Sequence, residues 1–260
     1  MKLNITKKSA ILFAVGAVLT CTILFVACNK ENAEKSNIND LSSPMKSEMT
    51  QPNNPVNPLD NIGINHNIHL NDVLSIINTR YIEPNSLSSD DVLGIYREYL
   101  INNGYAENDI DFAFEIIKEG CSLPGKVEQY MESLQDSISI IPNESYDNYK
   151  NLVMRYENRI MADATLNDVE EGALLAFTSV YRHSLYYWYE APSKALPNWV
   201  KIAAADAAGA AEGFVGGVTV HWALGVVCGV VMGVDKSIEK AEKLKDSEKP
   251  TTDSTSTGVN

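Results

Sequence analysis

A row of small residues recurs at every fourth position near the C-terminus of this chain. The row consists of Ala205, Gly209, Gly213, Gly217, Gly225, Gly229 and Gly233, and only His221 interrupts its register. Residues four apart lie on one stripe of an α-helix, and glycine in such a stripe lets a second backbone approach closely. The segment is therefore predicted to be helical and to pack against another helix along its glycine face.

Two environments fit this segment, and the sequence leaves both open. Phe214–Val234 holds no charged residue and is long enough to cross a bilayer as one helix. Asp206 and Glu212 make the stretch before it unsuitable as a second span. More lysines follow the segment than precede it, which would place the C-terminus in the cytoplasm. The alternative is a Gly- and Ala-rich helix that is buried in the core of a helical bundle.

The same segment loosely resembles the glycine-zipper segments of membrane-associated proteins. The resemblance implies membrane association or helix–helix self-association, in a homo-oligomer or with a partner helix. The helix-packing residues would be Gly209, Gly213, Gly217, Gly225, Gly229 and Gly233.

The N-terminus has the layout of an export signal. Lys2, Lys7 and Lys8 precede an uncharged run that ends at Ala27, which is typical of a signal peptide. The run closes with Phe25-Val26-Ala27-Cys28 and is followed at once by polar residues. This pattern resembles the lipobox of bacterial lipoproteins, with Phe25 in place of the usual leucine. The resemblance implies that residues 1–27 are removed and that Cys28 is lipidated, so that the chain binds membrane lipid through N-terminal acylation.

The lipobox also implies a location in the cell envelope of a Gram-negative bacterium. Asn29 differs from the aspartate that retains such lipoproteins in the inner membrane, so an outer-membrane lipoprotein is expected, on the periplasmic or the surface side. If Phe214–Val234 spans a bilayer, the inner membrane is expected instead.

Composition divides the chain into five parts. The predicted parts are the signal peptide 1–27, a lipidated cysteine with a disordered tether 28–67, a helical domain 68–190, the glycine-rich helix 191–246 and a disordered tail 247–260. The tether is rich in Asn, Ser, Glu and Lys, contains four prolines and shows no apolar periodicity.

Between Leu70 and Tyr189 the apolar residues recur with helical period and almost never alternate as in a strand. The predicted fold is all-α, an antiparallel helical bundle with a long Gly- and Ala-rich hydrophobic helix at the C-terminus. Stop and start signals predict helix boundaries at Ser88-Ser89, Asn103-Gly104, Gly120, Pro142 and Asn167-Asp168. Leu70–Tyr81 is predicted to be a further helix.

The charged and nucleophilic residues indicate no catalytic or metal site. The net charge of −13 argues against nucleic acid as a partner. No serine-hydrolase, zinc-protease or nucleotide-binding motif is present, so the chain is predicted to be non-enzymatic and to need no cofactor and no metal. His66 and His69, beside the polar tether, are interpreted as solvated, and His183 as a surface histidine or a core histidine with its hydrogen bonds satisfied. Cys121 and Cys228 are expected to be free thiols.

A group of aromatic residues provides an alternative function. The group comprises Tyr181, Tyr186, Tyr187, Trp188, Tyr189 and Trp199. Tyr187 and Trp188 could stack on a glycan or on another ligand with an apolar face, or the whole group could be ordinary helix packing. The sequence therefore predicts a non-enzymatic, lipid-anchored envelope protein, and the alternative is a ligand-binding lipoprotein.

Overall fold

The computed structural model describes residues 51–81, 87–141, 145–190 and 199–247. Within these ranges the regular structure consists of eight α-helices and no strand, which confirms the predicted all-α fold. The helices are α2 (Asp60–Arg80), α3 (Ser89–Asn102), α4 (Glu107–Glu119), α5 (Gly125–Ser139), α6 (Tyr146–Met161), α7 (Asp168–Glu190), α8 (Trp199–Val218) and α9 (Trp222–Ser247). The predicted signal peptide, lipobox and C-terminal tail lie outside the described residues.

Local signals in the sequence set several helix ends. The Ser88 hydroxyl accepts the backbone N–H of Asp91, and the Asp91 carboxylate accepts the backbone N–H of Ser88, which forms a capping box at the start of α3. Gly104 and Gly120 follow α3 and α4 with φ values of 82° and 74°. Few residues other than glycine adopt this left-handed conformation, which explains why both helices stop where they do.

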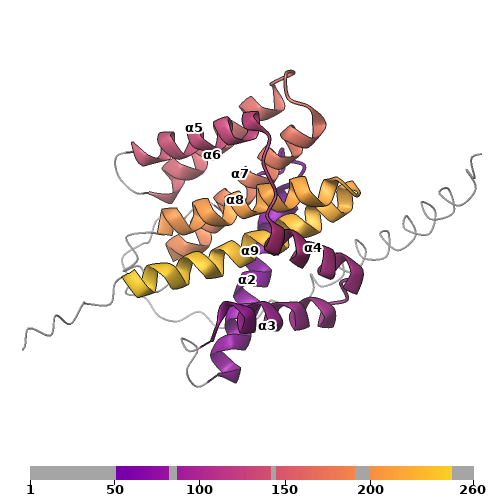
Figure 1. Cartoon of the computed structure of the whole chain (residues 1–260). Coiled ribbons are helices and arrows are strands. Elements are labelled where there is room, and N and C mark those ends of the chain that lie inside the picture. Colours follow the sequence, from indigo (N-terminus) through magenta and orange to yellow (C-terminus); the bar gives the residue numbers. More distant parts are fainter. Residues whose placement is uncertain (1–50, 82–86, 142–144, 191–198, 248–260) are drawn as a thin grey trace, which may run out of the picture. The chain divides into compact units, whose positions relative to one another are not determined.

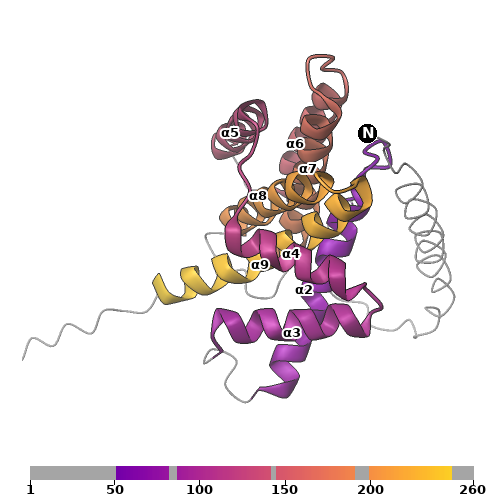
Figure 2. The ribbon, with the colours of Figure 1, turned by 45° about the vertical axis from the view of Figure 1, so that its right-hand side comes forward.

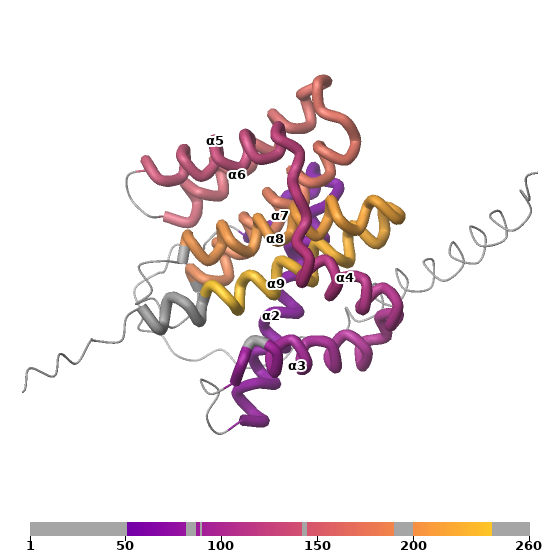
Figure 3. The backbone as a smooth tube through the Cα atoms, in the orientation of Figure 1, coloured from indigo at the N-terminus to yellow at the C-terminus, as the bar shows by residue number. Residues whose placement is uncertain are grey.

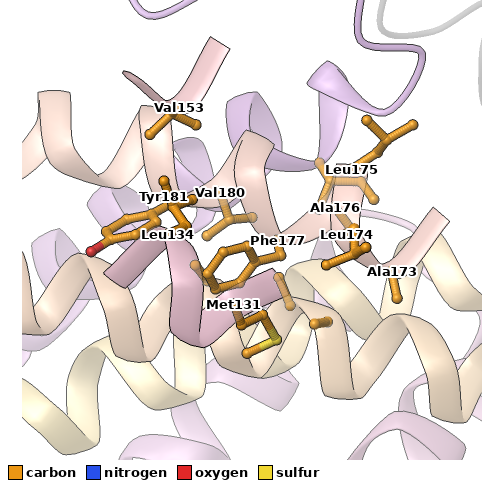
Figure 4. Close-up of a cluster of buried hydrophobic side chains, with 14 of the residues drawn as sticks. Met131, Leu134, Val153, Ala173, Leu174, Leu175, Ala176, Phe177, Val180 and Tyr181 are labelled. Carbon is orange, nitrogen blue, oxygen red and sulfur yellow. The ribbon is translucent and has the colours of Figure 1, made fainter. Parts of the chain in front are cut away.

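The α8–α9 hairpin lies at the centre of the bundle (Figures 1 and 2). α7 packs along α8, and α2 contacts both α7 and α9. One apolar core joins α5, α6, α7 and α8, and a second joins α2, α3, α4 and α9. Figure 4 shows the first core, where Phe177 and Tyr181 of α7 lie near Met131 and Leu134 of α5.

The Gly- and Ala-rich segment is helical as predicted, but the prediction of one continuous helix through Phe214–Val234 is wrong. α8 ends at Val218 and α9 begins at Trp222, so that the two run antiparallel, as the tube in Figure 3 shows. The Thr219 hydroxyl donates to the Gly216 carbonyl (2.7 Å), and His221 Nδ1 accepts the backbone N–H of Leu224 (3.0 Å). His221 therefore caps α9 at the point where it interrupts the glycine register. Among the described helices, none combines the length and apolar character needed to cross a bilayer.

The predicted tether boundary at residue 67 is also wrong. α2 begins at Asp60, and the preceding residues 51–59, here called the entry segment, already pack on the bundle. Asn54 and Asn57 are each only 2% exposed. The error arose because polar residues hold this segment, and a search for apolar periodicity does not detect them.

Candidate functional site

The predicted helix-packing glycines lie in the contact between α8 and α9. A Cβ atom on Gly213 would overlap the Cys228 carbonyl, and one on Gly209 would stand 2.6 Å from the Met232 carbonyl oxygen. Since real Cβ atoms do not approach a backbone so closely, only glycine permits this spacing. The contacts from the α9 side are looser: a Cβ atom on Gly225 or Gly229 would stand 3.0 or 3.1 Å from an α8 carbonyl oxygen, and one on Gly233 would stand 3.0 Å from His66 Cδ2 of α2. Gly217 faces the start of α9. The glycine stripe is therefore covered within the chain, as in the buried-core interpretation.

The predicted aromatic group does not form one surface. Tyr181 is buried against Phe177, and Tyr186 packs edge-to-face on Tyr146 of α6 with ring centroids 5.2 Å apart. Tyr187 and Trp188 contact each other and the second apolar core. The side chain of Trp199 lies outside the described residues. Ordinary helix packing therefore accounts for these contacts better than a stacking platform does.

The most unusual site in the described chain is a set of charged residues inside the bundle. Its first part, the Arg182 cluster, contains Asn54, Asn57, Asp60, Glu157, Arg182 and His183, which are all buried. Arg182 Nη2 donates to Asp60 Oδ1 (2.6 Å) and to Glu157 Oε1 (2.9 Å), and Nη1 donates to the Pro52 carbonyl. A buried cation with two carboxylates is stable only when the remaining polar atoms also have partners.

Most of those partners come from the entry segment, although Arg182 Nε has no hydrogen-bond partner among the described residues. Asn54 and Asn57 donate to the two Glu157 oxygens at 2.6 and 2.7 Å, and Asn57 also donates to the Leu175 carbonyl. Lys150 of α6 donates to the Gln51 carbonyl. The Arg182 cluster thus fixes the entry segment to α6 and α7 with charge-assisted hydrogen bonds.

Electrostatics within the cluster favour ionised Asp60. Burial raises the pKa of Asp60, but the hydrogen bond from His183 and the charge of Arg182 outweigh it and hold the pKa below its ordinary value. His183 is a core histidine, one of its two predicted alternatives, and its Nε2 lies 3.1 Å from Asp60 Oδ1.

Asn67 connects this cluster to a second one, the Asp206 cluster, made of His66, Ser184, Trp188 and Asp206. Asn67 Nδ2 donates to the His183 carbonyl (2.8 Å), which leaves its Oδ1 to accept from His66 Nδ1 (3.0 Å). This assignment places the proton of a neutral His66 ring on Nδ1 and makes Nε2 an acceptor. Nε2 lies 3.9 Å from Asp206 Oδ2.

Asp206 is a fully buried acid whose hydrogen-bond donors are all neutral groups. Its Oδ2 accepts from the Ser184 hydroxyl and from Trp188 Nε1 (3.3 Å), and the buried Ser237 hydroxyl also lowers the pKa of Asp206. Burial raises the pKa of Asp206 to about 7 and lowers that of His66 to about 4. The carboxyl therefore holds a proton through much of the range in which an exposed aspartate is ionised.

The prediction that His66 and His69 are solvated is wrong, because they are 0% and 5% exposed. His69 lies between the hydroxyls of Tyr96 and Tyr105, each 3.1 Å from a ring nitrogen. A signal was present in the sequence, since the buried positions recur with helical period once the histidines are counted as inward-facing. Those positions are Leu59, Ile62, His66, His69, Leu70, Val73 and Ile77.

Cys121 and Cys228 are free, as predicted. In the ranges that the structure describes, no three His, Cys, Asp or Glu side chains are grouped so as to hold a metal ion.

Comparison of the chain with protein-family models, curated proteins and solved structures gives no match. Any assignment of function therefore rests on the residues and on their geometry.

Asp206→Asn is expected to stabilise the protein at pH 8 and to leave its stability unchanged near pH 4. Because the folded-state pKa of about 7 lies above the ordinary aspartate pKa of 3.8, the contribution of Asp206 to stability is present below pH 4 and is lost as the pH rises through 7. The difference between these two pKa values corresponds to a free energy of unfolding at pH 8 that is higher by on the order of 4 kcal/mol in Asp206→Asn than in wild type. Urea unfolding of both proteins at the two pH values measures it.

The depressed pKa of His66 acts in the opposite direction, since its contribution is present above pH 6.5 and is lost as the pH falls through 4. This contribution of His66 is present in wild type and in Asp206→Asn, and it cancels from the difference in stability if the pKa of His66 is similar in the two proteins. Asp136→Asn, at an exposed position of α5, is the matched control and should change little. An Asp206→Asn protein that is less stable than wild type at pH 8 would contradict the raised pKa of Asp206.

Proposed function

We propose that the protein is a non-enzymatic, lipid-anchored protein of the bacterial cell envelope. Cys28 is its lipidated residue, and the helical bundle is the folded domain that the anchor holds at the membrane. The observation that carries the proposal is the sequence Phe25-Val26-Ala27-Cys28 at the end of an uncharged run that follows three lysines. Acyl chains on one cysteine hold a protein on a membrane through the burial of their methylene groups, each contributing about 0.8 kcal/mol.

The attachment of the entry segment supports this proposal. A protein held by its N-terminus transmits any pull through the first residues of its folded part. Here those residues bind Glu157 and Arg182, which are both fully buried. Polar bonds inside the core resist extraction because breaking them leaves charged groups without partners in a medium of low dielectric constant.

The positions of the polar clusters support a non-enzymatic role. Glu157, Arg182 and Asp206 are 0% exposed, and His183 is 3% exposed. An acid, a base or a nucleophile has to reach its substrate within hydrogen-bond distance. Glu157, Arg182 and His183 are bonded within the Arg182 cluster, and Asp206 is bonded to Ser184 and Trp188, so we assign all four to holding the bundle together.

The test is metabolic labelling with an alkyne-bearing fatty acid, followed by membrane fractionation of wild type, Cys28→Ser and Cys21→Ser. Cys21 lies in the predicted signal peptide and is the matched control. Wild type and Cys21→Ser should carry the label and sediment with membranes, and Cys28→Ser should lose the label entirely. Label on the Cys28→Ser protein, or its retention on carbonate-washed membranes at the mass of the processed chain, would refute the lipid anchor.

A further inference from the structure

A cavity of about 280 Å³ lies between α3, α4 and α9, outside both polar clusters. Leu93 of α3, Ile117 of α4 and Ile238 of α9 give it aliphatic walls, and Tyr96 contributes an aromatic ring. This volume is close to the lower end of the range for small-molecule sites in proteins, about 300–1,000 Å³. It therefore suits a small organic molecule of about ten non-hydrogen atoms.

The polar side of the cavity carries a net negative charge. Asp235, Lys236 and Glu239 line it, and Lys236 Nζ pairs with Glu239 Oε2 at 3.1 Å. No ion pair or hydrogen bond to the Asp235 carboxylate is found among the described residues, and the charge of Lys236 acts on it only at longer range. One negative charge in the wall is thus left without a direct partner.

The surroundings of Asp235 make that charge costly. Burial raises the pKa of the Asp235 carboxyl, the charge of Lys236 lowers it, and the charge of Glu239 raises it again. A carboxylate that is partly removed from water gains free energy from a cation that reaches it with an N–H donor. The adjacent aliphatic walls gain from an apolar body at the same time.

We propose that this cavity binds a small organic ammonium ion, whose apolar body packs against Leu93, Ile117 and Ile238 and whose ammonium group pairs with Asp235. A carboxylate or phosphate ligand is repelled by the net charge of the wall. A neutral ligand of the same shape fills the apolar part and leaves Asp235 without a partner, so it binds more weakly. This site is independent of the lipid anchor, and its failure would leave the anchor untouched.

The test is calorimetric titration of the full chain, purified in detergent, with 2-phenylethylammonium chloride and with 2-phenylethanol, which lacks the charge. The amine should bind at least about tenfold more tightly than the alcohol, which corresponds to 1.4 kcal/mol. Asp235→Asn removes the charge at nearly constant shape and should reduce amine binding to the level of the alcohol. Glu115→Gln, at an exposed position of α4, is the control and should bind the amine as wild type does.

A second variant tests the contribution of the apolar walls separately from that of the Asp235 charge. Leu93→Trp fills the apolar space and should abolish binding of both compounds while α3 stays folded, as far-UV circular dichroism can verify. Equal affinities for amine and alcohol, undiminished amine binding by Asp235→Asn, or no detectable binding of the amine would each overturn the proposal.

Discussion

Replacing Gly213 with alanine is expected to lower the free energy of unfolding by about 3 kcal/mol, although alanine is the better helix former. The added methyl group would overlap the Cys228 carbonyl oxygen, and that atom belongs to the α9 backbone and cannot turn aside as a side chain can. α8 and α9 must then separate along a contact that both apolar cores share. Urea unfolding followed by far-UV circular dichroism measures the change.

Gly94→Ala is the matched control for this substitution. Gly94 lies within α3, and no atom is within 4 Å of the position that its Cβ would occupy. Alanine there should raise the free energy of unfolding by about 0.5–1 kcal/mol through helix propensity alone. If the two variants shifted stability in the same direction and by similar amounts, the close α8–α9 contact would be refuted.

The second large effect is expected for Arg182→Met, which should cost about 3–5 kcal/mol of stability. Methionine retains the apolar part of the side chain but leaves Asp60 and Glu157 without their shared cation, and Pro52 without its donor. Loss of these bonds should also release the entry segment, so limited proteolysis before Asp60 should accelerate. Thermal and urea unfolding, with mass spectrometry of the cleavage products, test both consequences.

Arg80→Met is the control for charge removal. Arg80 pairs with Glu98 at 3.1 Å, but the two side chains are 51% and 54% exposed. An exposed pair contributes little because water screens it, and we expect a change of less than about 1 kcal/mol. Equal costs for the two arginine substitutions would show that the Arg182 cluster does not fix the entry segment as described.

Local features of the sequence predicted much of the fold. Ser88 and Gly120 marked helix ends because capping and left-handed backbone conformations depend on single residues. The glycine stripe predicted a close helix contact for an equally local reason. The sequence did not show which backbone fills the stripe. His221 interrupts the glycine register, but the turn there was not predicted, and only the fold shows that the His221 ring caps α9.

The polar clusters could not be predicted, since their members come from distant parts of the chain. Asn54 contacts Glu157, and His66 lies near Asp206, although the partners are far apart in the sequence. Hydrophobic periodicity gives no information on contacts at such sequence separations. A segment whose histidines and asparagines are buried also has the same amino-acid composition as a solvated tether. Their role depends on the partners that the fold supplies, which explains why the entry segment was assigned to the tether.

Isotope-filtered NOE spectroscopy distinguishes a glycine stripe that is filled within one chain from a stripe that joins two chains. Equal amounts of isotope-labelled and unlabelled protein are mixed, and contacts within a chain are separated from contacts between chains. The structure places the position of a Gly213 Cβ 2.9 Å from the Gly229 amide nitrogen. We therefore expect an NOE between the Gly213 α protons and the Gly229 amide proton within labelled chains only. The same NOE between labelled and unlabelled chains would show that the stripe joins two molecules and would contradict the hairpin.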